Sequence, residues 1–86
     1  MEMLMIAKFS KVTFDEWLAV YNGDAELRAK FMKDDIVAKV DEHTAFIKAT
    51  ITDPDGMQQI MASRMAEVAD KMGLEHEPFI LTPVGQ

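Results

Sequence analysis

The spacing of hydrophobic and polar residues changes along the chain, and the changes mark the predicted helices and strands. Alternation with a period of two is typical of strands, whereas apolar residues three or four positions apart are typical of an amphipathic helix. The strand pattern occurs in Met3–Phe9, Ile36–Val40, Thr44–Ile51 and Phe79–Thr82. The helix pattern occurs in Thr13–Met32 and Pro54–Met72. The predicted order is βαββαβ, which is the order of the split-βαβ, ferredoxin-like α+β fold.

Residues at the predicted helix ends support these boundaries. Thr13 and Glu16 have the spacing of a capping box, in which each side chain bonds the backbone amide of the other. The Asn-Gly-Asp run at 22–24 interrupts the first apolar stripe, so we expect two shorter helices to meet there. Pro54 suits the first position of the second helical region, and Gly73 suits its left-handed end.

The predicted strands are apolar on both faces, although the helices can cover only one face of a four-stranded antiparallel sheet. We expect the face under the helices to contain Met3, Met5, Ala7, Phe9, Ile36, Ala38, Val40, Ala45, Ile47, Ala49 and Ile51. The opposite face combines lysines and threonines with Leu4, Ile6, Val37 and Phe46, and with either Ile80 or the pair Phe79 and Leu81. A second sheet packed on this face would bury its apolar side chains. We therefore predict a twofold homodimer whose interface contains Leu4, Ile6, Val37 and Phe46.

Length and composition add a reason for self-association. The 86 residues form one predicted domain, 1–86, and a domain this small is marginally stable alone. The chain has no cysteine, so neither a disulfide nor a thiolate metal site can stabilise it, and oligomerisation is the remaining remedy. The net charge of −6 opposes binding to nucleic acid. Because no apolar run reaches membrane-spanning length and the N-terminus has no basic leader, we expect a cytoplasmic protein without a membrane partner.

Four short segments carry a resemblance to a known family, namely Phe14–Trp17, Leu27–Arg28, Met72–Leu74 and Glu77–Pro78. In them, and over nearly its whole length, the chain resembles the dimeric α+β barrel superfamily, in particular its small bacterial members. The resemblance implies two sheets packed across a dimer axis and, in enzyme members, a ligand cleft between sheet and helices. It implies no single reaction, because the superfamily includes cofactor-independent monooxygenases, haem-degrading enzymes and lactone isomerases. No histidine here matches a haem ligand, and we expect no cofactor.

Three residues of the first helical region are the candidate ligand-binding residues. Trp17, Tyr21 and Arg28 would line such a cleft, with the rings stacking on a planar ligand and the guanidinium holding an anionic group. The alternative is structural, because aromatic residues at helical spacing are usually core residues and a lone arginine is usually a surface charge. No Ser or Thr has a recognisable base beside it, so the sequence identifies no catalytic residue.

Two histidines and three lysines are weaker candidates for chemistry. We expect His43 in a turn and His76 in the loop before the last strand, both at one end of the sheet and both beside carboxylates. Such residues could share a divalent metal, but loop histidines are ordinarily solvated, and we predict no metal site. Lys8, Lys39 and Lys48 are expected on one face of the sheet, where they would hold a small anion or, more ordinarily, pair with carboxylates.

The sequence supports two hypotheses for function. In the first, the homodimer binds a small hydrophobic or aromatic molecule between sheet and helices, either as a binding protein or as an enzyme of the cofactor-independent monooxygenase kind. In the second, the protein is a non-catalytic dimerisation or structural module with a fully packed interior. The eight methionines fit both hypotheses, since thioethers line adaptable pockets and also fill irregular cores. A cavity beside Trp17 would distinguish the two.

Overall fold

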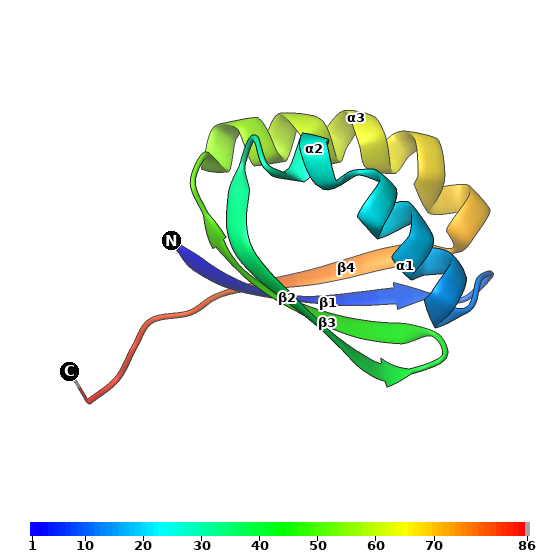
Figure 1. Ribbon diagram of the computed structural model, residues 1–86, viewed down its shortest axis with the longest axis horizontal. Helices are drawn as coiled ribbons and strands as arrows, with labels where there is room; N and C mark the ends of the chain where they lie inside the picture. The colour runs from blue at the N-terminus through cyan, green and yellow to red at the C-terminus, as the bar shows by residue number, and fades with distance from the viewer. Residues whose placement is uncertain (86) are drawn as a thin grey trace.

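The computed structural model describes residues 1–85, apart from the side chain of Met65, and it has the α+β architecture that the sequence predicts (Figure 1). The strands are β1 (Glu2–Phe9), β2 (Met32–Asp41), β3 (Thr44–Ile51) and β4 (Leu74–Ile80). The helices are α1 (Phe14–Gly23), α2 (Ala25–Arg28) and α3 (Pro54–Met72). None of the helices within residues 1–85 is long and apolar enough to cross a membrane.

The strands form one antiparallel sheet in the order β2-β3-β1-β4, as the ferredoxin-like topology requires. The helices lie on the same face of this sheet (Figure 1). The core lies between the two layers and consists of Met3, Met5, Ala7, Phe9, Phe14, Trp17, Phe31, Ala45, Ile47, Ala49, Ile51, Met57 and Met72. The predicted inner faces of β1 and β3 are therefore confirmed.

The helix ends confirm the predicted capping box and the predicted glycine at the end of the last helix. The Glu16 amide donates to the Thr13 hydroxyl at 3.3 Å, and the Thr13 amide donates to the Glu16 carboxylate at 3.0 Å. At the start of α3, the Asp53 carboxylate accepts from the Gly56 amide at 3.0 Å. Gly73 ends α3 with a φ of 63°, the left-handed conformation that glycine adopts most easily.

The last strand begins earlier than the alternation predicts. β4 starts at Leu74 rather than at Phe79 and ends at Ile80. The alternation does not reveal this early start, because residues 75–78 are three charged or polar residues and a proline, which are unusual inside a strand. β4 is an edge strand, and edge strands tolerate proline because one row of their backbone groups is unpaired. His76 therefore lies within a strand, not in a loop before it.

The second strand also begins earlier than predicted. Met32, which the helical pattern included, is already in β2, and the helical region ends at Arg28. The pairing register of β2 with β3 shifts between Lys33 and Ile36, where Asp34 has a φ of 54°. A bulge of this kind adds an unpaired residue and re-aims the side chains that follow it.

The two faces of β2 are the reverse of the predicted ones. Val37 lies opposite Ile47 and packs against the core, whereas Ile36 is 64% exposed. The alternation predicted Ile36 under the helices and Lys39 on the opposite face. At this edge strand, however, Lys39 lies on the helix side, where its ammonium group is 5.5 Å from the Phe14 ring and reaches solvent. The structure thus removes Val37 from the predicted set of interface residues on the sheet's other face.

The sheet face turned away from the helices is called the outer face below. Its apolar residues are Leu4, Ile6, Ile36, Ala38, Phe46 and Phe79. They are adjacent across the strands, since Ile6 lies opposite Phe46 and Leu4 lies opposite Phe79. Of the alternatives for the last strand, the outer face contains Phe79, while Ile80 lies opposite Met3 on the helix side.

Candidate functional site

A cavity of about 100 Å³ lies between the sheet and the helices. Most of its wall is apolar, with methionines from β1 and α3 prominent in it, and the polar residues that line it are Tyr21, Asp24, Arg28, Arg64 and His76. Trp17, Tyr21 and Arg28, the residues predicted to bind a ligand, all line this cavity. Well-packed cores contain few voids larger than one water molecule. The cavity therefore does not fit the fully packed interior of the second hypothesis.

Trp17 forms an aromatic wall of the cavity. Its ring stacks on Phe9, with centroids 5.1 Å apart and planes 6° from parallel, and on Tyr21 at 5.1 Å and 26°. Phe14 packs against it at 5.8 Å in a tilted arrangement. Because only 3% of Trp17 is exposed, these neighbours hold the indole in one orientation. The residue belongs to the core and to the cavity wall at the same time, so the structural and functional interpretations are compatible.

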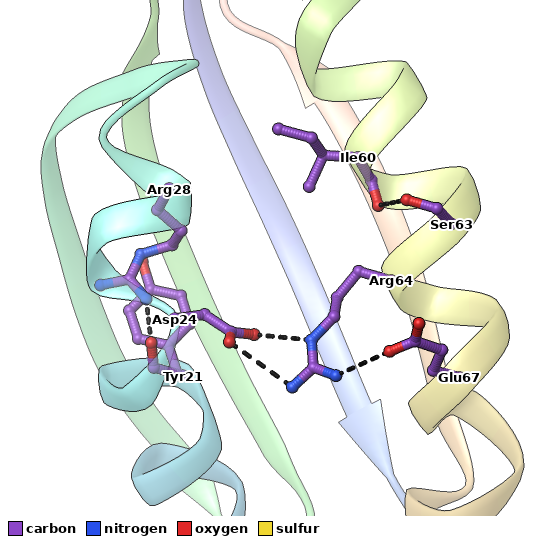
Figure 2. A network of polar contacts seen from close by, with 7 residues as sticks. All are labelled: Tyr21, Asp24, Arg28, Ile60, Ser63, Arg64 and Glu67. Atoms are coloured by element: carbon purple, nitrogen blue, oxygen red, sulfur yellow. Dashed lines mark hydrogen bonds and ion pairs between the residues drawn. The ribbon is translucent and has the colours of Figure 1, made fainter.

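Arg28 is engaged by groups of the protein itself. Its guanidinium carbon lies 3.6 Å from the Tyr21 ring centroid, and Nη1 donates to the Tyr21 carbonyl oxygen (Figure 2). Nη2 lies 3.6 Å from the Asp35 carboxylate, which also accepts from the Tyr21 hydroxyl at 2.6 Å. Burial, together with the hydrogen bond to Asp35, raises the pKa of Tyr21, which therefore stays protonated. Arg28 thus has an internal counter-ion, which weakens its predicted role as the receptor of an anionic ligand group.

A second arginine, Arg64, joins the two helical segments across the cavity. It extends from α3 to Asp24, which lies between α1 and α2 (Figure 2). Nε and Nη2 bond the two Asp24 oxygens at 3.1 and 3.4 Å, and Nη1 bonds the Glu67 carboxylate at 3.0 Å. A bidentate pair of this kind fixes the orientation of both side chains. The contact therefore ties α3 to the α1–α2 junction.

The sequence analysis missed Arg64, although the chain contains a signal for it. The apolar face of α3 includes Ile60, Met61 and Val68, and Arg64 lies at helical spacing from all three. A charged residue inside an apolar stripe must either reach solvent or meet an opposite charge. Its partner Asp24 is 40 residues away in sequence, so no local pattern identifies the pair.

His76 brings an imidazole into the cavity from β4. It lies opposite Ala7 of β1, on the face under the helices, and it lines the cavity. Burial lowers the pKa of His76 below its ordinary value, so the ring is neutral at pH 7. His76 is half-buried, and among the described residues the side-chain atom that is buried without a hydrogen-bond partner is Nε of Arg28.

The other histidine and the three lysines do not form a site. His43 Nδ1 is 3.1 Å from the Phe9 carbonyl oxygen and 2.9 Å from that of Val12, so this nitrogen carries the proton and fastens the turn. In the described part of the chain, no group of three or more His, Asp or Glu residues is arranged to hold a metal ion. Lys39 bonds Glu42 and lies on the helix side, so the three lysines do not share one face as predicted.

Comparison with known proteins identifies the fold. No family model matches the chain, and no curated protein matches it. Among solved structures, the cofactor-independent oxygenase SnoaB from Streptomyces nogalater matches 99% of this chain and 98% of its own, with 15% identity and a TM-score of 0.60. A mutant of SnoaB matches with the same identity and coverage and a TM-score of 0.61. The chain therefore has the same ferredoxin-like α+β fold as this oxygenase. At this identity the likeness establishes the fold and not the reaction.

Proposed function

We propose that the protein binds a small hydrophobic or aromatic molecule in the cavity between the sheet and the helices. The observation that carries this proposal is the cavity itself, with about 100 Å³ of space and a mainly apolar wall. An apolar cavity of about 150 Å³ in another protein stays dry and takes up benzene. The Trp17 and Tyr21 rings form an aromatic wall on which a planar ligand can stack.

The reaction that we propose for this site is the oxidation of the bound aromatic molecule by O₂ without a cofactor. In such a reaction the substrate itself supplies the electrons that reduce oxygen, so it must be an electron-rich aromatic compound. The structural likeness to an enzyme described as a cofactor-independent oxygenase supports this class. The buried apolar wall supports it too, because water is kept away from reactive oxygenated intermediates.

We also propose that the protein is a homodimer formed through the outer face of the sheet. Leu4, Ile6 and Phe46 remain in the proposed interface, and Ile36 and Phe79 take the place that the sequence analysis gave to Val37. Phe46 and Phe79 are 37% and 47% exposed in the single chain, and a second sheet would cover both. Contiguous exposed apolar residues of this kind are typical of protein–protein interfaces.

Fluorescence, thermal unfolding and oxygen uptake test the ligand and the reaction separately. Trp17 is the single tryptophan of the chain, so its emission reports on the cavity alone. A panel of small hydroxylated aromatics should quench this emission, and a ligand at about 100 times its Kd should stabilise the fold by about 2.7 kcal/mol. If no compound changes the emission or the Tm, the binding proposal is wrong. Compounds that bind without oxygen uptake, with chelator present and no cofactor added, would leave a binding protein and exclude the oxygenase.

A further inference from the structure

A lysine lies in the middle of the apolar outer face. Lys48 of β3 lies opposite Leu4 on β1 and opposite Ile36 on β2, and Phe46 lies on the same side of β3. In the single chain Lys48 is exposed to solvent. A second sheet that covers these apolar residues would also remove the ammonium group from water. This is costly unless the group meets an opposite charge.

The positive charge of Lys48 is not balanced within residues 1–85. The basic side chains that form ion pairs in this part of the chain are Lys8, Arg28, Lys39 and Arg64. Glu2, on the neighbouring strand β1, accepts a hydrogen bond from the Thr50 hydroxyl instead. A partner for Lys48 must therefore come from another molecule if the outer face becomes covered.

The opposite imbalance of charge occurs on β4, at the edge of the outer face. Glu75 and Glu77 both lie on this face, where they are opposite Lys8 and Ile6 of β1. The Lys8 ammonium group is 3.9 Å from the Glu77 carboxylate, and both side chains are more than half exposed. One lysine thus accompanies two carboxylates, so this edge of the face has an excess of negative charge.

The two imbalances cannot cancel within one chain. Because β1 lies between β3 and β4, the backbones of Lys48 and Glu77 are about 10 Å apart across the sheet. Both side chains leave the sheet in the same direction, not toward each other. Two sheets packed face to face are also about 10 Å apart, but their side chains point toward each other. The two side chains can therefore meet in a twofold dimer in which β3 of one copy faces β1 and β4 of the other.

We propose that Lys48 of one copy pairs with Glu77 of the partner subunit, and that this pair sets the alignment of the two sheets. The inference rests on the proposed dimer and names the contact that orients it. Of the two carboxylates, Glu77 lies closer to the apolar residues, opposite Ile6, whereas Glu75 lies near the end of the sheet. Apolar contacts alone permit several alignments, and a charged pair excludes those that bring like charges together.

Charge reversal on the two sides of the pair tests the proposal. Twofold symmetry repeats the contact, so Lys48→Glu and Glu77→Lys would each place like charges at two sites. Each should raise the dimer dissociation constant, measured by sedimentation, by about tenfold or more. In a heterodimer of the two variants, however, both contacts join opposite charges. An equal mixture should therefore contain more heterodimer than the statistical share, which native mass spectrometry measures when one variant is ¹⁵N-labelled.

Lys30→Glu and Glu26→Lys are the matched controls. They make the same changes of charge at exposed positions in and just after α2, on the helix side of the sheet (Figure 1). Each control should dimerise as the wild type does, and their mixture should give the statistical share of heterodimer. The comparison separates the proposed contact from the general repulsion between chains that carry a net charge of −6.

The other outcomes distinguish the pair from the dimer. Charge reversals that weaken the dimer no more than the controls, or a mixture without excess heterodimer, would overturn the pair and leave the dimer intact. A monomeric wild type would overturn the proposed dimer and this inference together. If a charge-reversal variant does not fold, Lys48→Met and Glu77→Gln replace it in a double-mutant cycle. Their effects on the dissociation constant should be non-additive, and additive effects would overturn the pair.

Discussion

On β3, alternate residues lie in two very different environments. Ala45, Ile47 and Ala49 are at most 6% exposed beneath the helices, whereas Phe46, between them, is 37% exposed on the outer face. Both faces are apolar, but only one is covered within the single chain. The covered face encloses a cavity, and the uncovered face presents a contiguous apolar surface.

We propose that the two faces have different tasks. The inner face has enough polar groups, held by the Arg28–Asp35 and Arg64–Asp24 pairs, to orient a ligand. The outer face also contains charged residues, such as Lys8 opposite Glu75, and Lys48 between Leu4 and Ile36. We therefore expect substitutions on the outer face to alter assembly, and substitutions on the inner face to alter ligand binding.

The largest effect is expected for Phe46→Glu on the outer face. It would place an unpaired carboxylate in the proposed interface, which costs about 3–5 kcal/mol, or more than about a hundredfold in the dimer dissociation constant. Ala19→Glu, on the exposed side of α1, adds the same charge and should leave assembly unchanged. Native mass spectrometry and sedimentation would measure both variants. A Phe46→Glu protein that stays dimeric would show that association does not involve the outer face.

Filling the cavity should have the next largest effect. Val68 lines the cavity from α3, and Val68→Phe would place a ring in the space that we assign to the ligand. The affinity for small aromatics should fall by about tenfold or more, while the dimer stays intact. Ala66→Phe puts the same ring on the exposed side of α3 and serves as the control. The affinities would be measured by Trp17 fluorescence. Equal affinities of the two variants would show that the ligand does not bind in this cavity.

Removal of the Asp24–Arg64 pair should have a moderate effect on ligand exchange. The pair ties α3 to the α1–α2 junction beside the cavity, so Arg64→Gln or Asp24→Asn should loosen that connection (Figure 2). Association and dissociation should both accelerate by about two- to fivefold, the modest scale of a partly exposed ion pair. Glu67→Gln removes only the outer partner of Arg64 and should change neither rate. Stopped-flow fluorescence would measure the rates, and equal rates in all four proteins would contradict a gating role.

Sequence alone predicted the parts of the fold that depend on local patterns. The Thr13–Glu16 capping box and the unbroken alternation in β1 and β3 are local features. The first favours the start of a helix, and the second favours a strand with one buried face. The strand order follows from the order of the elements, because few topologies are compatible with βαββαβ. Trp17, Tyr21 and Arg28 line one cavity, and their role in ligand binding stays a prediction.

The remaining features depend on contacts that are distant in sequence. The start of β4 and the faces of β2 were mispredicted because both are edge strands. An edge strand accepts charged or polar residues, such as Lys39 and those at 75–78, at positions where a buried strand would not. The internal neutralisation of Arg28 requires Asp35, on a different element, to fold back beside it. The side of the sheet on which His76 lies depends on the pairing register of β4 with β1. That register could not be predicted for His76, because the predicted strand began after it.

The smallest effect is the dependence of stability on pH that His76 contributes through the inner face. Burial lowers the pKa of folded His76, whereas the unfolded chain has the ordinary value of about 6.5. Between these two values the unfolded state binds more protons than the folded state, so the free energy of unfolding falls as the pH decreases below about 6.5. Below the folded pKa, His76 causes no further change. Urea unfolding of wild type and His76→Gln across this range should show a steeper loss in wild type, and parallel curves would mean that the ring is not buried in the cavity.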